Sequence, residues 1–154
     1  MKTQTKIRLC LWIVIIGLVL SGVTAFPIES ELDVLKGHLS PGGVMGNWIA
    51  KIYDAVKTTN RQFPWLSYGT DWLAFAHLVI AVVFIGPLRD PVRNIWVIRF
   101  GMIACAGIIP FAFIAGEVRD IPVFWRLIDC SFAAGAFIPL YFSYKYTRKL
   151  ERSA

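Results

Sequence analysis

Four long apolar runs constrain this chain more than any other feature of its sequence. They lie at about residues 9–26, 72–88, 95–115 and 123–144, and a helix that crosses a bilayer needs about 17 to 25 such residues. Backbone N–H and C=O groups find no water in hydrocarbon, so such runs form helices there. With 56% hydrophobic and 17% charged residues, the chain is too apolar for an ordinary soluble domain. We predict an all-α fold, a four-helix transmembrane bundle, as one membrane domain over residues 1–154.

The first run has two interpretations. Residues 1–8 carry Lys2, Lys6 and Arg8 and no acid, and Val23-Thr24-Ala25 is small enough for a signal peptidase site. An apolar run of about 18 residues is also long enough to remain in the membrane as a helix. We favour the retained helix. A mature protein that begins at Phe26 would instead indicate a cleaved signal peptide.

The extracytoplasmic segment, residues 27–70, mixes acids and bases and is the one sizeable part predicted outside the bilayer. Ser30 and Asp33 are spaced like a capping pair at the start of a short helix, which Ser40-Pro41-Gly42-Gly43 ends. A second, amphipathic helix is expected from about residue 46 to 60, because apolar side chains recur there at helical spacing. Its apolar face is suited to the membrane surface or the ends of the bundle, as a connector or as a lid.

Turn-forming residues mark the ends of the predicted spans. The aromatic and turn-rich residues 63–69 are expected where the chain re-enters the headgroup zone, so that the second span begins at Asp71 and Trp72. Gly86-Pro87 then ends it. Pro110 and Pro139 fall inside the third and fourth spans, where each predicts a kink that neighbouring helices accommodate.

The distribution of basic residues predicts the orientation. If both termini are cytoplasmic, ten of the 16 Lys and Arg residues lie on the inner side with two of the ten acids, Asp90 and Glu151. Basic residues concentrate in short cytoplasmic loops of membrane proteins, so the count favours this topology. Arg99, about one turn inside the third span, is expected to extend its side chain to the headgroups or to Asp90.

The same distribution bears on partners. The formal net charge of +6 lies beside apolar runs, which favours membrane lipids as partners over nucleic acid. Small residues four apart, Ser131 with Gly135 and Gly101 with Cys105, allow close helix approach. That approach fits packing within one bundle, a homodimer, or another membrane protein as the partner. No metal or other cofactor is expected, because the three cysteines are far apart and only one histidine, His77, lies in a predicted helix.

One polar cluster is predicted at the outer leaflet. Charged residues within a span are costly and usually pair or mark a functional site. His77 lies six residues after Asp71, and Asp129 six after Val123, so both are about 9 Å into their helices at 1.5 Å per residue. Arg126 and Asp129 are three apart on one helix and can pair directly. The predicted rim above them consists of Asp71, Glu117, Arg119 and Asp120.

Three functions fit this cluster. In the structural interpretation, which we favour, Arg126 and Asp129 form an ion pair and His77 holds the second span against the fourth. In the second, a small enzyme or binding protein uses His77 or Asp129 as a proton carrier, and Arg126 anchors an anionic amphiphile. The third is proton-coupled transport, or a metal site, which would need at least three ligands such as His77, Asp129 and Glu117 and has no signature in their spacing. The sequence does not decide whether the protein is an enzyme.

A family resemblance follows from TDWLAFAH at residues 70–77, IGPLRDPVRN at 85–94 and FWRLIDCSF at 124–132. With these motifs the chain resembles small four-pass bacterial membrane proteins, which implies a bacterial cytoplasmic (inner) membrane. It is more distantly similar to VanZ-like proteins, which also have four helices, an acid and a histidine opening the second helix, and an arginine, aspartate and glycine in the last. The spacing from Asp71 to His77 is wider here, and alanines replace the asparagine expected before Gly135. The resemblance implies a site at the outer leaflet of the cell envelope and no particular activity.

Overall fold

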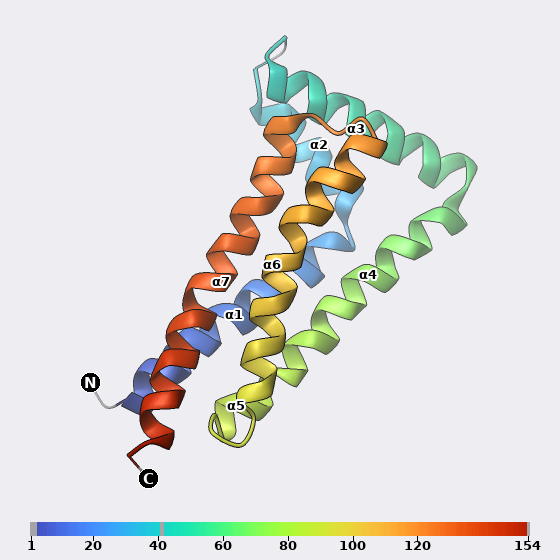
Figure 1. Ribbon diagram of the computed structural model, residues 1–154. Helices are drawn as coiled ribbons and strands as arrows, with labels where there is room; N and C mark the ends of the chain where they lie inside the picture. Colours follow the sequence, from blue (N-terminus) through green and yellow to red (C-terminus); the bar gives the residue numbers. More distant parts are fainter. Residues whose placement is uncertain (1–2, 41, 154) are drawn as a thin grey trace. The chain divides into compact units, whose positions relative to one another are not determined.

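Helices account for nearly all of the structure (Figure 1). The computed structural model describes residues 3–40 and 42–153, so Lys2 and Pro41, which entered the predictions, lie outside the described part. Seven helices occur in it: α1 (Thr3–Ala25), α2 (Ile28–His38), α3 (Val44–Gln62), α4 (Pro64–Val83), α5 (Ile85–Arg89), α6 (Ile95–Val118) and α7 (Val123–Glu151). The described residues contain no strand, and the all-α prediction is confirmed.

Four helical stretches are long and apolar enough to cross a membrane: Thr3–Ala25, Pro64–Arg89, Ile95–Val118 and Val123–Glu151. Each extends beyond its predicted apolar run, because hydropathy marks the part that suits hydrocarbon whereas the backbone hydrogen bonds continue into the headgroup zone. Large apolar side chains are exposed along these helices, for example Ile103 (71%) and Phe132 (73%). Lipid would cover such side chains, as a multi-pass membrane protein requires.

The structure corrects two predicted helix starts. Helix α4 begins at Pro64 and not at Asp71, because proline is well suited to the first helical position, where its missing N–H is not needed. The predicted aromatic turn at residues 63–69 is therefore mostly helix. At α2, Pro27 is the N-cap residue and no side chain caps the helix, so Ser30 and Asp33 lie inside α2 and do not form a capping pair.

Pro87 interrupts the second span earlier than the predicted stop at Gly86-Pro87, and the kinks predicted at Pro110 and Pro139 stay predictions. Helix α4 ends at Val83, four residues before Pro87, whose missing N–H cannot bond to the Val83 carbonyl. The short helix α5 then continues to Arg89. Pro110 and Pro139 lie inside α6 and α7 respectively, and both helices continue past them.

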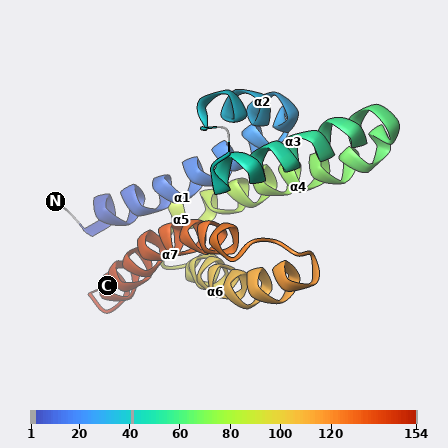
Figure 2. The same ribbon diagram turned by 90° about the horizontal axis from the view of Figure 1, so that it is seen from above.

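The chain forms two compact units, of which one comprises Leu18–Ile80. Helices α2 and α3 pack side by side in this unit and bury Leu32, Ile49 and Tyr53 (Figure 2). Here α1 also approaches α4 closely: a Cβ added to Gly22 would lie 2.9 Å from the carbonyl oxygen of Ala74. The two amphipathic helices predicted between the first and second spans are thus confirmed.

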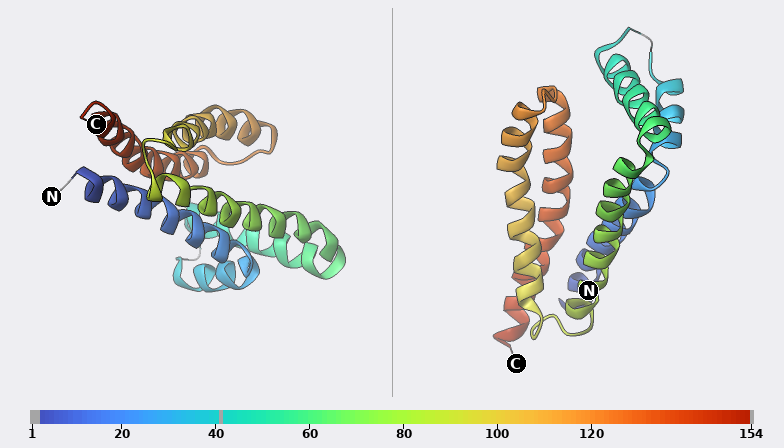
Figure 3. Two further views of the ribbon diagram at one scale, coloured as in Figure 1. Left: turned by 90° about the horizontal axis from the view of Figure 1, so that it is seen from below. Right: turned by 90° about the vertical axis from the view of Figure 1, so that its right-hand side faces the viewer.

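The other unit comprises Met1–Gly17 and Ala81–Ala154, and its main feature is the antiparallel pair of α6 and α7 (Figure 3). Gly101 permits close packing there, because an added Cβ would lie 2.8 Å from Cζ of Phe84 and 3.0 Å from Cδ1 of Leu140. By contrast, a Cβ on Gly135 would meet nothing within 4 Å. Of the two predicted small-residue pairs, the one on α6 is therefore buried and the one on α7 is exposed.

Candidate functional site

The turn between α6 and α7 is built as a Schellman motif. The N–H of Asp120 donates to the carbonyl of Glu117 (3.2 Å), and the N–H of Ile121 donates to the carbonyl of Gly116 (2.9 Å). Asp120 adopts a left-handed backbone conformation (φ 53°), which glycine usually supplies and aspartate tolerates better than most residues. Pro122 then precedes α7. The turn directs the end of α6 back along the start of α7.

Arg126 is buried at this turn, with only 9% of its side chain exposed. Its Nε donates to the carbonyl oxygen of Ile121 (2.7 Å), and its Nη1 donates to Oε2 of Glu117 (2.7 Å). Hydrogen bonds that involve a charged group are shorter and stronger than neutral ones. The guanidinium therefore fastens the first turn of α7 both to the connecting turn and to the last turn of α6. We call Gly116, Glu117, Ile121 and Arg126 the turn lock.

Each charge of the turn lock lies at a helix end whose dipole has the same sign as the charge. Arg126 is in the first turns of α7, where the helix dipole is positive, and Glu117 is in the last turn of α6, where it is negative. Within these end turns α7 has no acid and α6 no base, and the nearest base at the end of α6 is the exposed Arg119 at its C-cap. The ion pair between the two helices compensates both.

Gly116 provides the space that the guanidinium needs. A Cβ at this position would lie 2.7 Å from both Cδ and Nε of Arg126 and 3.0 Å from its Cγ. These distances are shorter than van der Waals contact, and the side chain is held at its far end by Ile121 and Glu117. A side chain at residue 116 is therefore incompatible with the observed position of Arg126.

The pairing predicted for Arg126 is corrected by this geometry. Its ion-pair partner is Glu117, nine residues earlier, whereas Asp129 is exposed and forms no ion pair with the described residues. Spacing along one helix suggested Asp129, but the burial of Arg126 beneath α6 directs it to the neighbouring helix instead. Arg119 is exposed at the C-cap of α6. Of the predicted site residues, the structure thus brings Glu117 and Arg126 together.

His77 and Asp71 belong to the unit that contains α2, α3 and most of α4. Both side chains are half-buried, and Nδ1 of His77 lies 2.8 Å from the carbonyl oxygen of Leu73, one turn earlier in α4. This local hydrogen bond occupies one ring nitrogen. The proton-carrier roles of His77 and Asp129 and the binding roles of Asp71 and Arg119 stay predictions.

Two further observations concern metal ligands and the partner of Arg126. Among the described residues, no group of three or more His, Cys, Asp and Glu side chains is placed to bind a metal ion. Sequence reasoning missed Glu117 as the partner of Arg126, and the available signal was the short break at residues 119–122 between two long helices. Such a break makes the helices antiparallel neighbours, so residues on either side of it can meet.

Comparisons with family models, with curated proteins and with solved structures found no match to this chain. The similarity to VanZ-like proteins accordingly stays an expectation from the sequence motifs alone.

Proposed function

We propose that this chain is a structural or accessory multi-pass protein of the bacterial cytoplasmic membrane, with both termini in the cytoplasm. The observation that carries the proposal is the engagement of Arg126 in the turn lock. Arg126 is the one of the six basic residues predicted on the outer side that lies inside a predicted span. Its Nε and Nη1 both donate hydrogen bonds to other residues of the protein. A buried and internally paired guanidinium stabilises architecture.

The engagement of Arg126 weighs against the binding role predicted for it. An anionic headgroup would have to displace the Glu117 carboxylate from Nη1 and reach a side chain that is only 9% exposed. Breaking a buried ion pair by removing one partner costs several kcal/mol, on the order of 3 to 5. Glu117 is 79% exposed, so solvent lowers that cost here. An anionic headgroup would itself compensate the guanidinium, so the low exposure of Arg126 is the main obstacle to binding there.

A small outer-leaflet enzyme or binding protein is the second candidate, and one observation favours it. Asp129 lies on the exposed face of α7 within a candidate span. An unpaired carboxylate facing lipid is expensive, so a ligand, a proton or another helix is expected to compensate it. In this candidate Asp129 and His77 carry the proton chemistry, while Arg126 holds α7 in place.

Variants of the two groups of residues separate these candidates. We expect Glu117→Gln and Arg126→Gln to lower accumulation and thermal stability in the membrane, because each leaves a charge of the turn lock uncompensated. Arg119→Gln, an exposed neighbour, serves as the matched control and should accumulate normally. For His77→Ala and Asp129→Asn, the structural proposal expects function to be lost only where accumulation is lost as well, so a variant that accumulates normally should complement a deletion strain. Normal accumulation without complementation would contradict it and support the second candidate.

The topology is tested separately with reporters. A reporter fused after Arg152 should be active in the cytoplasm, and one inserted between Gly42 and Gly43, in the connection between α2 and α3, should be active outside it. The reverse result at either position would contradict the proposed orientation.

A further inference from the structure

We propose that the C-terminal end of α7 binds the headgroup phosphate of an anionic phospholipid in the cytoplasmic leaflet. The residues concerned surround an open hollow of about 550 Å³, and they are Tyr144, Lys145, Arg148, Lys149, Arg152 and Ser153. We call these six residues the basic end of α7. The inference rests on the membrane insertion and orientation proposed above, and its test is designed to fail independently of them.

The length of α7 places the basic end in the headgroup zone. Its 29 residues span about 43 Å at 1.5 Å per residue, whereas the hydrocarbon core is about 30 Å thick. With the outer boundary at Val123, the last two to three turns of α7 lie beyond the hydrocarbon. Residues 145–151 belong to those turns, and Arg152 follows as the C-cap residue.

Arg99 and Tyr144 indicate where the hydrocarbon ends. Arg99 Nη2 donates to the hydroxyl of Tyr144 (3.3 Å), and the guanidinium carbon lies 5.4 Å from the centre of the same ring. This is the snorkelling expected of an arginine near an interface, with Tyr144 and not Asp90 as its partner. Tyr144 is thus a boundary residue on the edge of the basic end.

The charges at the basic end are only partly compensated. Arg148 forms an ion pair with Glu151 (2.5 Å), and the Nζ of Lys145 lies 5.8 Å from the ring centre of Tyr141. Lys149 and Arg152 are exposed and have no ion pair within residues 3–40 and 42–153. Lys149 and Arg152 lie three residues apart, and Lys145 lies four residues before Lys149. The three side chains therefore share one helix face. This face offers several cationic donors to one phosphate.

Compensation of the helix dipole explains only part of this charge. Cations in the last turn of a helix offset the negative dipole at its C-terminus, which accounts for Arg148 and Lys149. Lys145 lies a full turn earlier. In the same unit, the Nζ of Lys6 lies 5.4 Å from the ring centre of Tyr146, which adds a cation from α1 beside the same helix end. A concentration of positive charge at headgroup depth attracts anionic lipid.

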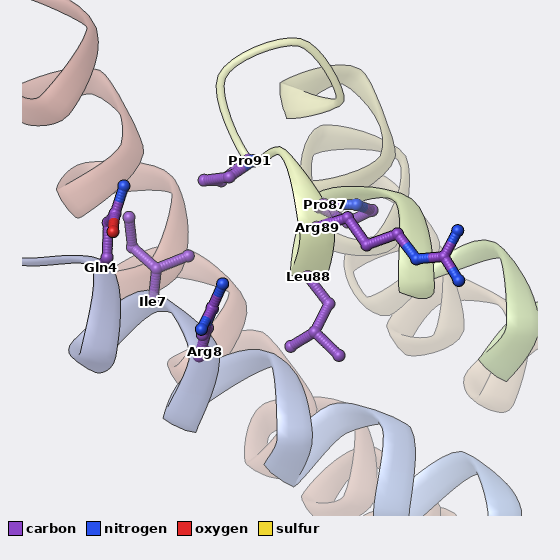
Figure 4. A pocket seen from close by; sticks show the side chains of 7 residues that line it. All are labelled: Gln4, Ile7, Arg8, Pro87, Leu88, Arg89 and Pro91. Carbon is purple, nitrogen blue, oxygen red and sulfur yellow. The ribbon is translucent and has the colours of Figure 1, made fainter.

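A second hollow near this end of the unit is too small for the same role. Gln4, Ile7 and Arg8 of α1 and residues 87–89 and 91 line it (Figure 4). Its volume is about 20 Å³, which is room for about one water molecule. The Arg89 side chain extends away from α1 (Figure 4). The larger hollow on α7 is therefore the site that we assign to the phosphate.

The test measures lipid binding to the purified full chain. Native mass spectrometry in detergent would follow titration with dihexanoyl phosphatidylglycerol and, separately, with dihexanoyl phosphatidylcholine. We expect tighter binding of the anionic lipid, and weaker binding in the double variant Lys149→Gln/Arg152→Gln. One Lys or Arg near an anionic surface is worth about fivefold in affinity, so the double variant should lose about 25-fold.

Two further variants serve as controls. Lys51→Gln/Arg61→Gln removes the same charge from exposed positions on α3 and should leave the preference for phosphatidylglycerol unchanged. Lys149→Arg/Arg152→Lys keeps the charge and should retain the affinity. Equal affinity for the two lipids, or an equal loss in the α3 control, would overturn the proposal. So would inorganic phosphate binding as tightly as the lipid, since the site would then take a free anion.

Membrane insertion is measured, before solubilisation, in the cell membranes from which each variant is purified, by extraction with alkaline carbonate. A chain that remains in the membrane but shows no lipid preference would refute the lipid site alone. A chain released by carbonate would contradict the proposed function as well.

Discussion

Replacing Gly116 with alanine tests the turn lock directly. The new Cβ would lie 2.7 Å from Cδ and Nε of Arg126, so either the guanidinium or the α6 backbone must move. A flexible side chain normally yields at little cost. Here the guanidinium is held by the Ile121 carbonyl and by the Glu117 carboxylate, both at 2.7 Å, so movement sacrifices at least one strong hydrogen bond. We expect Gly116→Ala to destabilise the protein.

The magnitude follows from two opposing contributions. Overpacking of a well-packed site costs about 1 to 3 kcal/mol, and alanine recovers about 1 kcal/mol of helix propensity over glycine. Gly107, nine residues earlier in α6, is the matched control, because a Cβ there would meet nothing within 4 Å. The propensity gain is common to both variants. The difference in unfolding free energy between Gly116→Ala and Gly107→Ala therefore isolates the overpacking cost.

Reversible unfolding in mixed micelles, followed by tryptophan fluorescence, is a suitable assay. For a chain of this size each kcal/mol corresponds to about 2 to 4 °C in melting temperature, so the two variants should be clearly separated. Combining each with Arg126→Gln completes a double-mutant cycle, and the cost of Gly116→Ala should then fall to that of Gly107→Ala. The reasoning is refuted if the two glycine variants are equally stable, or if the cost persists without Arg126.

Three other predictions concern packing and charge elsewhere in the chain. Asn60 donates to the carboxylate of Glu29 (2.6 Å), and Asn60→Asp would place two carboxylates against each other. Asn60→Asp should therefore reduce the hydrogen-exchange protection of α2 and α3 more than Asn60→Ala does, by about 1 kcal/mol or more. Equal protection in the two variants would contradict this. The hydrogen bond from Lys57 to the Tyr53 hydroxyl (2.9 Å) raises the pKa of Lys57. The contact therefore stabilises α3 at neutral pH and is lost as pH rises through that pKa. Tyr53→Phe should lower the pKa of Lys57 in an NMR titration. An unchanged pKa would exclude the hydrogen bond as the cause of the raised value. Gly101→Ala, whose Cβ would lie 2.8 Å from a neighbouring ring, should lose about 1 to 3 kcal/mol relative to Gly107→Ala in the unfolding assay, and equal stability would refute the close packing.

Features that depend on neighbouring residues in the chain were predictable from the sequence. The four spans follow from apolar runs, because the requirement for internal backbone hydrogen bonds in lipid leaves the helix as the way for each run to cross. The two amphipathic helices follow from the 3.6-residue period. Pro87 indicated a break in the second span, but α4 ends at Val83, because the missing N–H of a proline removes a hydrogen bond to the carbonyl four residues earlier. The early start of α4 at Pro64 was missed because a proline beside aromatic residues suits both a turn and the first position of a helix.

Which charges meet was decided only by the tertiary structure. Asp129 is three residues from Arg126 and seemed its natural partner, yet the burial of Arg126 against α6 gives it to Glu117. That pairing depends on the antiparallel return of the chain, on the left-handed backbone at Asp120, and on the absence of a side chain at Gly116. Arg99 likewise meets Tyr144, 45 residues away, and not the nearby Asp90. Spacing along a helix defines which residues can share a face, whereas the partner of a buried charge is fixed by the neighbouring helix that excludes water from it.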